Sequence, residues 1–116
     1  MTAIKIYGIK NCDTMKKAFA WLDKNGIAYD FHDYKKEGAD PAILKQAIAT
    51  HGWENTLNRK GTSWRQLPDK TKETMTEKTA LKAATENPSL IKRPLLVKGG
   101  KIHLGFDEAD YKKLFK

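Results

Sequence analysis

The first third of the chain changes its hydrophobic pattern twice. Residues 2–7 alternate between apolar and polar side chains, which predicts a β-strand. Apolar residues then recur at helical spacing over residues 12–25, and the alternation returns over residues 28–33. The helical stripe consists of Met15, Ala18, Phe19 and Leu22. This order predicts two parallel strands joined by a helix that ends at Asn25-Gly26.

The middle of the chain has helical patterns and no further strand signal. Lys35–Gly38 is predicted to be a polar connection, after which Asp40 and Pro41 supply an N-cap and a first-turn proline. Residues 52–67 predict short helical pieces broken at Gly61, with Ser63 and Gln66 forming a capping box. A further helix is predicted over residues 76–87. We therefore expect residues 40–87 to form a helical insertion.

The sequence from residue 94 onward predicts a β-hairpin followed by a helix. Residues 94–98 and 101–104 are strand-like and are separated by Gly99-Gly100, a typical two-residue hairpin turn. Asp107 is placed to cap a helix over residues 108–115. The order β-α-β, helical insertion, β-β-α predicts an α/β fold with a four-stranded mixed sheet.

Composition limits the classes of protein to consider. With 116 residues, 40% hydrophobic and 31% charged, the chain is long enough for one domain. No apolar run approaches the length of a membrane span and no signal peptide precedes the first strand, so we expect a cytoplasmic protein. The net charge is +8, and the lysines that supply it are dispersed. Dispersed lysine is typical of a solvated surface, and the charge favours small anionic partners such as glutathione.

Cys12 is the only cysteine, which excludes an internal disulfide and a cysteine-rich zinc site. It stands where the first strand gives way to the first helix, and the free amides and dipole of a helix start stabilise a thiolate. Lys10, Lys16 and Lys17 are expected to add positive charge. We therefore favour a reactive thiol over an inert buried cysteine. Asn11 is either a site residue or the N-cap of this helix.

Arginine is rare in this lysine-rich chain and occurs only at positions 59, 65 and 93. Such residues are candidates for bidentate contacts with anions, although bracing of a loop is the alternative for Arg59 and the favoured interpretation for Arg65. Pro94 begins a predicted strand, where either an ordinary proline or a cis-proline beside a ligand would fit. The histidines, which are far apart, are interpreted as structural or surface residues.

Three blocks of sequence carry a family resemblance: residues 6–18, residues 58–65 and residues 91–95, together with the ending Gly105-Phe106. On these blocks the chain resembles the ArsC/Spx/YffB family and is most similar to its YffB type. The resemblance implies one thioredoxin-like domain over residues 1–116. Its core is expected in residues 1–35 and 88–116, with the helical insertion over residues 40–87.

The resemblance also implies roles for single residues. Cys12 matches the catalytic cysteine, Arg59 and Arg93 match arginines that arsenate reductases use around the oxyanion, and Pro94 matches a cis-proline. Met15 stands where Spx-type regulators often carry a second cysteine, so a disulfide at Cys12 must be resolved by an outside thiol. Residues 103–106 contain no arginine, unlike the corresponding region of arsenate reductases, which places arsenate reduction second.

These observations predict a glutathione-dependent monothiol reductase, a thiol-disulfide oxidoreductase with Cys12 as its thiolate nucleophile. Asn11, Arg59, Arg93 and Pro94 are the predicted substrate-binding residues. No bound cofactor or metal is expected, and glutathione is the cosubstrate. One alternative is an arsenate reductase with glutaredoxin as a partner. Another is a non-enzymatic, Spx-like transcriptional regulator that binds RNA polymerase. We expect no membrane partner, and binding to nucleic acid through charge alone is a third and weaker alternative.

Overall fold

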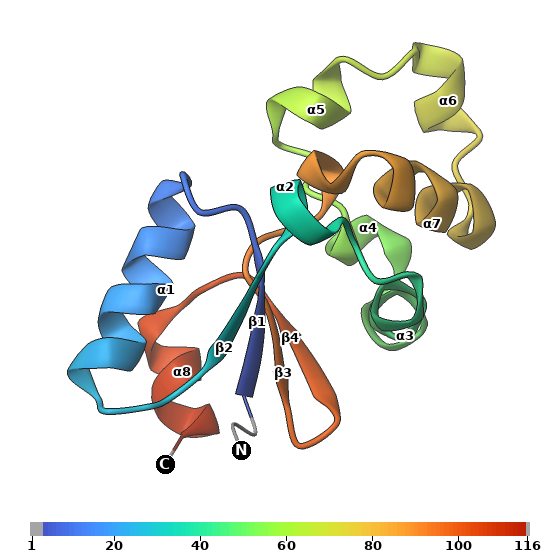
Figure 1. The fold of residues 1–116 in the computed structure, drawn as a ribbon. Coiled ribbons are helices and arrows are strands. Elements are labelled where there is room, and N and C mark those ends of the chain that lie inside the picture. The colour runs from blue at the N-terminus through green and yellow to red at the C-terminus, as the bar shows by residue number, and fades with distance from the viewer. Residues whose placement is uncertain (1–3, 116) are drawn as a thin grey trace. The chain divides into compact units, whose positions relative to one another are not determined.

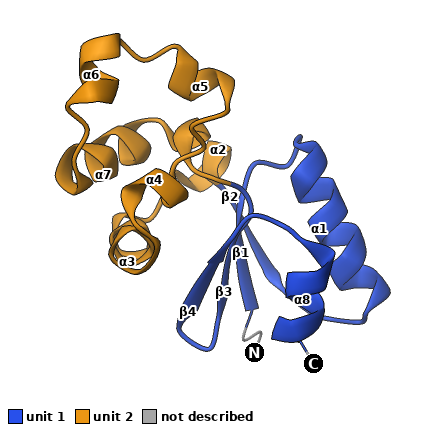
Figure 2. Cartoon of the chain, turned by 180° about the vertical axis from the view of Figure 1, so that it is seen from behind, with its two compact units in different colours: residues 1–33, 93–116 blue, residues 34–92 orange. Residues whose placement is uncertain are grey.

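A computed structural model of the chain describes residues 4–115. The protein divides into two compact units, which Figure 2 shows in different colours. The first unit consists of residues 1–33 and 93–116, and the second consists of residues 34–92. The first unit holds the sheet, and the second is mostly helical.

The first unit contains the predicted four-stranded mixed sheet, which is confirmed. Its strands have the order β2-β1-β3-β4, with β1 parallel to β2 and antiparallel to β3, and with β3 antiparallel to β4. The elements of this unit are β1 (Ile4–Gly8), α1 (Asp13–Lys24), β2 (Asp30–Asp33), β3 (Leu95–Lys98), β4 (Lys101–Leu104) and α8 (Glu108–Leu114). The strand after the predicted helix therefore begins two residues later than its alternation indicated.

Helices α1 and α8 lie on the same face of the sheet (Figure 1). Ile6 of β1 and Leu96 of β3 lie opposite each other on neighbouring strands, and both are fully buried in the core on this face. The rings of Trp21 and Tyr111 meet edge to face with centroids 5.5 Å apart, which joins α1 to α8. The predicted stripe on α1 is buried except at Phe19, which is half-buried at the margin of this core.

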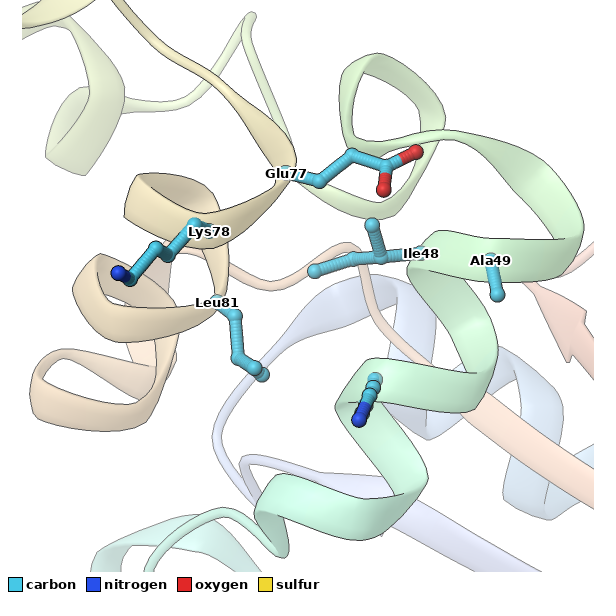
Figure 3. Close-up of a pocket in the computed structure, with 6 residues that line it drawn as sticks. Ile48, Ala49, Glu77, Lys78 and Leu81 are labelled. Atoms are coloured by element: carbon cyan, nitrogen blue, oxygen red, sulfur yellow. The ribbon is translucent and has the colours of Figure 1, made fainter.

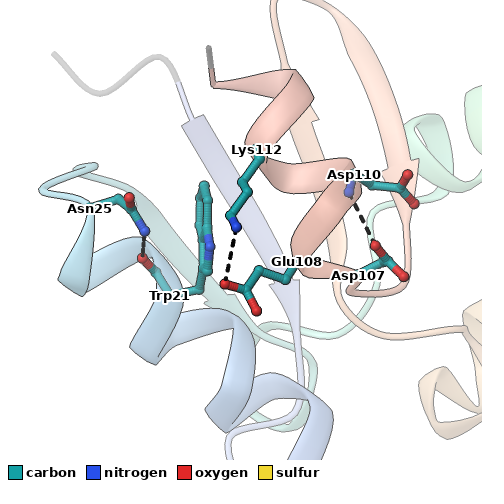
Figure 4. A network of polar contacts seen from close by, with 6 residues as sticks. All are labelled: Trp21, Asn25, Asp107, Glu108, Asp110 and Lys112. Carbon is teal, nitrogen blue, oxygen red and sulfur yellow. Dashed lines mark hydrogen bonds and ion pairs between the residues drawn. The ribbon is translucent and has the colours of Figure 1, made fainter.

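The ends of both helices follow local signals in the sequence (Figure 4). Gly26 has φ of 67° after the end of α1, and the Asn25 side chain donates to the Trp21 carbonyl at 2.8 Å. Asp107 caps α8 by accepting a hydrogen bond from the Asp110 amide at 3.1 Å. The predicted caps at these two positions are therefore confirmed.

The second unit is built from short helices that a few backbone hydrogen bonds tie together. Its elements are α2 (Tyr34–Glu37), α3 (Pro41–His51), α4 (Trp53–Thr56), α5 (Thr62–Arg65), α6 (Asp69–Glu73), α7 (Glu77–Glu86) and the 3-10 turn η1 (Pro88–Leu90). Leu57 and Ile91 form an isolated antiparallel bridge, beside which the Lys92 amide donates to the Thr56 carbonyl at 2.8 Å. Of the helices described, none is long and apolar enough to cross a membrane.

Two local predictions for the second unit are wrong. Helix α5 begins after Gly61 and has no side-chain cap, so Ser63 and Gln66 do not form a capping box. Ser63 instead lies inside the helix, and the N-cap position is held by Gly61, which has no side chain to accept a hydrogen bond. The segment expected as a polar connection forms the helical turn α2, because the buried ring of Tyr34 anchors its first residue.

Candidate functional site

Cys12 is the N-cap residue of α1. Its backbone is extended, with φ of −142° and ψ of 130°, and its carbonyl accepts the first helical hydrogen bond from the Lys16 amide at 2.9 Å. The residue is partly exposed. The sulfur is therefore accessible at the end of a helix where unpaired amides and the helix dipole favour negative charge.

The surroundings of Cys12 favour its thiolate. Partial burial is the largest single influence and by itself raises the pKa of the thiol. Hydrogen bonds from the Met15 backbone, the Arg93 side chain and the Thr14 backbone act in the opposite direction, as does the positive charge of Arg93. Together they outweigh burial, so the pKa of Cys12 lies below the ordinary value of a free thiol.

Sheet topology explains how Arg93 reaches a residue so distant in sequence. Strands β1 and β3 are antiparallel with Tyr7 opposite Leu95, so the end of β1 lies beside the start of β3. The loop that leads from β1 to Cys12 therefore meets the residues that precede β3. The Arg93–Pro94 peptide bond at this point is cis, and Pro94 is fully buried.

The positive charge at the sulfur has a different source from the one the sequence indicated. The side chain that lowers the pKa of Cys12 is Arg93, and the expected contribution of Lys10, Lys16 and Lys17 is not found. These lysines are exposed, where solvent weakens their effect, whereas Arg93 is half-buried.

Gly8 permits α1 to begin close to the end of β1. A Cβ atom at Gly8 would lie 2.5 Å from the Met15 Sδ atom, far inside the contact distance. Met15 is fully buried, so its thioether fills the space over the glycine backbone. This packing holds the first turn of α1, including the two amides that face the Cys12 sulfur, against the strand.

The prediction that Asn11 caps α1 is wrong. Cys12 itself has the extended backbone of an N-cap and supplies the first helical carbonyl, which leaves Asn11 one position outside the helix. The side chain of Asn11 is exposed beside Cys12. Its alternative role, in binding a substrate at the thiol, stays a prediction.

Arg59 belongs to the second unit. Its Nε atom donates to the Glu54 carbonyl at 3.2 Å, and its guanidinium lies 6.0 Å from the centre of the Trp53 ring. It lines a hollow with two other basic residues, Lys60 and Lys92. Arg59 thus braces its loop, and its role in binding an anion stays a prediction.

Arg65 also has the bracing role favoured for it, because its Nη2 atom donates to the Lys60 carbonyl at 2.9 Å.

Another cavity, between α3 and α7, offers no comparable chemistry. Ile48 and Leu81 project into it from the two helices, and Lys45, Ala49, Glu77 and Lys78 complete its lining (Figure 3). None of these side chains is an activated nucleophile. Among residues 4–115, moreover, no group of three or more His, Cys, Asp or Glu side chains is arranged to hold a metal ion.

Almost the whole chain is similar to known proteins of one family. The ArsC family model matches residues 7–114. An uncharacterized protein of Haemophilus influenzae is 44% identical over 112 residues, which cover 97% of this chain and 98% of that protein. The solved structure of a YFFB protein is 46% identical with a TM-score of 0.91 and covers 95% of this chain and 96% of its own.

A third relative has a solution structure. It is an arsenate reductase (ArsC) related protein from Brucella melitensis, 47% identical with a TM-score of 0.78, and the match covers 100% of this chain and 96% of that one. The mixed sheet with its helices is the thioredoxin-like fold that glutaredoxins also have. By sequence and by fold, the chain belongs to the ArsC family.

Proposed function

We propose that this protein is a glutathione-dependent monothiol reductase in which Cys12 is the nucleophile. The observation that carries the proposal is the placement of the Cys12 sulfur, where the Met15 and Thr14 amides and the Arg93 guanidinium lower the pKa of the thiol. Because the thiolate is the attacking species in disulfide exchange, this environment raises the reactive fraction at neutral pH.

The proposed reaction has two exchange steps. The Cys12 thiolate attacks the glutathione sulfur of a mixed disulfide, the S–S bond breaks, and the substrate leaves as a thiolate. A second glutathione thiolate then attacks the Cys12–glutathione disulfide, which releases glutathione disulfide and restores the Cys12 thiolate. The substrate is reduced, and the two glutathione sulfurs end as the oxidised product.

An outside thiol is needed because the chain has no second cysteine. Met15 holds the position where a resolving cysteine would lie, and it is fully buried against Gly8. A thioether cannot attack the mixed disulfide. We therefore assign the resolving step to glutathione in solution.

The other predicted residues have parts in this proposal. Arg93 stabilises negative charge on the Cys12 sulfur when it attacks and again when it leaves. Arg59 is proposed to hold an anionic group, either a glutathione carboxylate or a substrate oxyanion. The backbone beside Pro94 is proposed to pair with the peptide of glutathione, and Asn11 to contact the substrate beside the thiol.

The test is the rate of alkylation by iodoacetamide as a function of pH, followed by turnover of a glutathionylated peptide. We expect the alkylation rate to rise with an inflection below that of a free thiol, about 8.5, and the Cys12→Ser variant to show neither alkylation nor turnover. Turnover is followed as formation of glutathione disulfide, coupled to glutathione reductase. An inflection at the ordinary thiol value, or equal turnover by Cys12→Ser, would contradict the proposal.

Arsenate reduction is a second candidate, and the name of the Brucella melitensis relative and the guanidinium at the thiol favour it. An assay with arsenate, glutathione and glutaredoxin separates it from the general reductase. The regulator alternative predicts something else: capture of RNA polymerase that Cys12→Ser leaves intact and that reversal of surface charge abolishes.

A further inference from the structure

A hollow with an aromatic floor lies beside the start of α1 within the first unit, and Asn11, the neighbour of Cys12 in the chain, is one of the residues that line it. Its cavity volume is about 410 Å³. It is formed between α1 and the edge strand β2, together with the loop before α1. The side chains that line it are Lys10, Asn11, Lys16, Phe19, Asp23, Tyr29 and Phe31. The mechanism proposed above uses only Asn11 of this set.

The floor of the hollow consists of three aromatic rings. Phe19 stacks on Tyr29 with centroids 5.4 Å apart, and it meets Phe31 edge to face at 5.0 Å. All three residues are half-buried, so they rest on the core and still present ring surface to the hollow. Such a surface suits an aromatic or large aliphatic side chain.

Charge is distributed unevenly along the rim. Lys10 and Lys16 lie at the end near the thiol, since Lys10 is two residues before Cys12 and the Lys16 amide bonds to the Cys12 carbonyl. Asp23 lies two helical turns further along α1, about 10 Å away. It is engaged by the Tyr29 hydroxyl, whose pKa is raised by burial, by the charge of Asp23 and by this hydrogen bond. The end next to the sulfur is therefore cationic.

We propose that this hollow selects the protein substrate, taking a polypeptide segment that carries an aromatic or large aliphatic side chain and a carboxylate close to its glutathionylated cysteine. The apolar side chain lies on the Phe19, Tyr29 and Phe31 rings, and the carboxylate meets Lys10 and Lys16. Glutathione matches only the cationic end, because it has carboxylates but no large apolar side chain to cover the rings. This inference rests on the proposed function and adds the substrate class to it.

The experiment uses the full chain and two synthetic peptides, each bearing one cysteine as a mixed disulfide with glutathione. One peptide has Phe and Glu beside the cysteine, and the other has Ser and Lys at the same positions. The measured quantity is the second-order rate of glutathionylation of Cys12, quenched with acid and followed by mass spectrometry. We expect the wild type to prefer the Phe/Glu peptide by about tenfold at low salt. The preference should shrink as salt screens the lysines.

Two charge reversals on adjacent residues of α1 provide a matched pair. Lys16→Glu should lower the ratio of the two rates about threefold or more, because it places a carboxylate at the cationic end. Lys17→Glu changes the net charge equally, but Lys17 does not line the hollow and lies instead beside Trp21 and Lys24. Its ratio should equal that of the wild type. A further variant, Tyr29→Ser, should lower the ratio by removing part of the floor.

The outcomes separate this inference from the proposed function. Equal rates with both peptides, or equal losses in Lys16→Glu and Lys17→Glu, would overturn the substrate site while leaving the reductase intact. Reaction with neither peptide would overturn both. The ratio is insensitive to a general change in the reactivity of the thiol, since such a change affects both peptides alike.

Discussion

Tyr111 offers a sharp test of how the core of the first unit is held together. Its ring is fully buried and meets those of Phe106, Trp21 and Phe115 at 4.8, 5.5 and 6.0 Å between centroids. Its hydroxyl makes no hydrogen bond within residues 4–115. Replacing Tyr111 with Phe keeps every ring contact and removes only the buried polar group. We therefore expect the Tyr111→Phe variant to be more stable than the wild type.

The expected gain in stability follows from the burial of the Tyr111 hydroxyl without a hydrogen-bond partner. Leaving a buried hydroxyl without a partner costs about 1–3 kcal/mol, and removal of the group recovers part of it. We expect a gain of about 1–2 kcal/mol in the free energy of unfolding. A kcal/mol shifts the melting temperature of a chain this long by about 4 °C, so Tm should rise by about 4–8 °C.

Thermal and urea unfolding of both proteins provide the measurement, with Tyr29→Phe as the matched control. Tyr29 is half-exposed and its hydroxyl bonds to Asp23, so the same atomic change there should be neutral or slightly destabilising. A lower Tm for Tyr111→Phe than for the wild type would refute the reasoning, because it would mean that the hydroxyl has a stabilising partner.

Burial of Tyr111 should also make the stability of the protein depend on pH in the alkaline range. Burial raises the pKa of Tyr111 in the folded protein above its unfolded value of 10.0. The neutral group stabilises the fold fully below the unfolded value, and this contribution is lost as pH rises above it, because only the unfolded chain then ionises. The stability of Tyr111→Phe should exceed that of the wild type by a growing margin above about pH 10.

Three further predictions concern other parts of the chain. Arg93→Met should raise the pKa of the Cys12 thiol, measured from the pH dependence of alkylation, while Arg93→Lys should raise it less. Gly8→Ala should destabilise the protein by about 1–3 kcal/mol in urea unfolding, because the added methyl group overlaps Met15. Adding Met15→Ala to this variant should relieve part of the overlap. Thr76→Ala should cost about 1 kcal/mol by removing the capping box of α7, whereas Ser63→Ala should change stability by less than about 0.5 kcal/mol.

Local signals predicted much of the fold. Gly99-Gly100 has positive φ at both residues, as a two-residue hairpin turn requires, and Asp107 caps its helix. Each of these features depends on a few consecutive residues. The capping box of α7 was missed because Thr79, whose hydroxyl pairs with Thr76, stands where the usual sequence signature has Glu or Gln.

The site was predicted only in part, because its chemistry depends on contacts between distant residues. Cys12 was found from its place before a helix, a local feature. The contact of Arg93 with the sulfur depends on the pairing of β1 with β3, and no local pattern encodes that register. The aromatic hollow was missed for the same reason, since Phe19 was assigned to the core stripe and its neighbours Tyr29 and Phe31 to a strand.

The most direct test is a titration of the thiolate by its ultraviolet absorbance, with Cys12→Ser as the blank. We expect a midpoint below that of a free thiol, about 8.5, in the wild type, and a higher midpoint in Arg93→Met. A wild-type midpoint at or above about 8.5, or one that Arg93→Met leaves unchanged, would contradict this expectation.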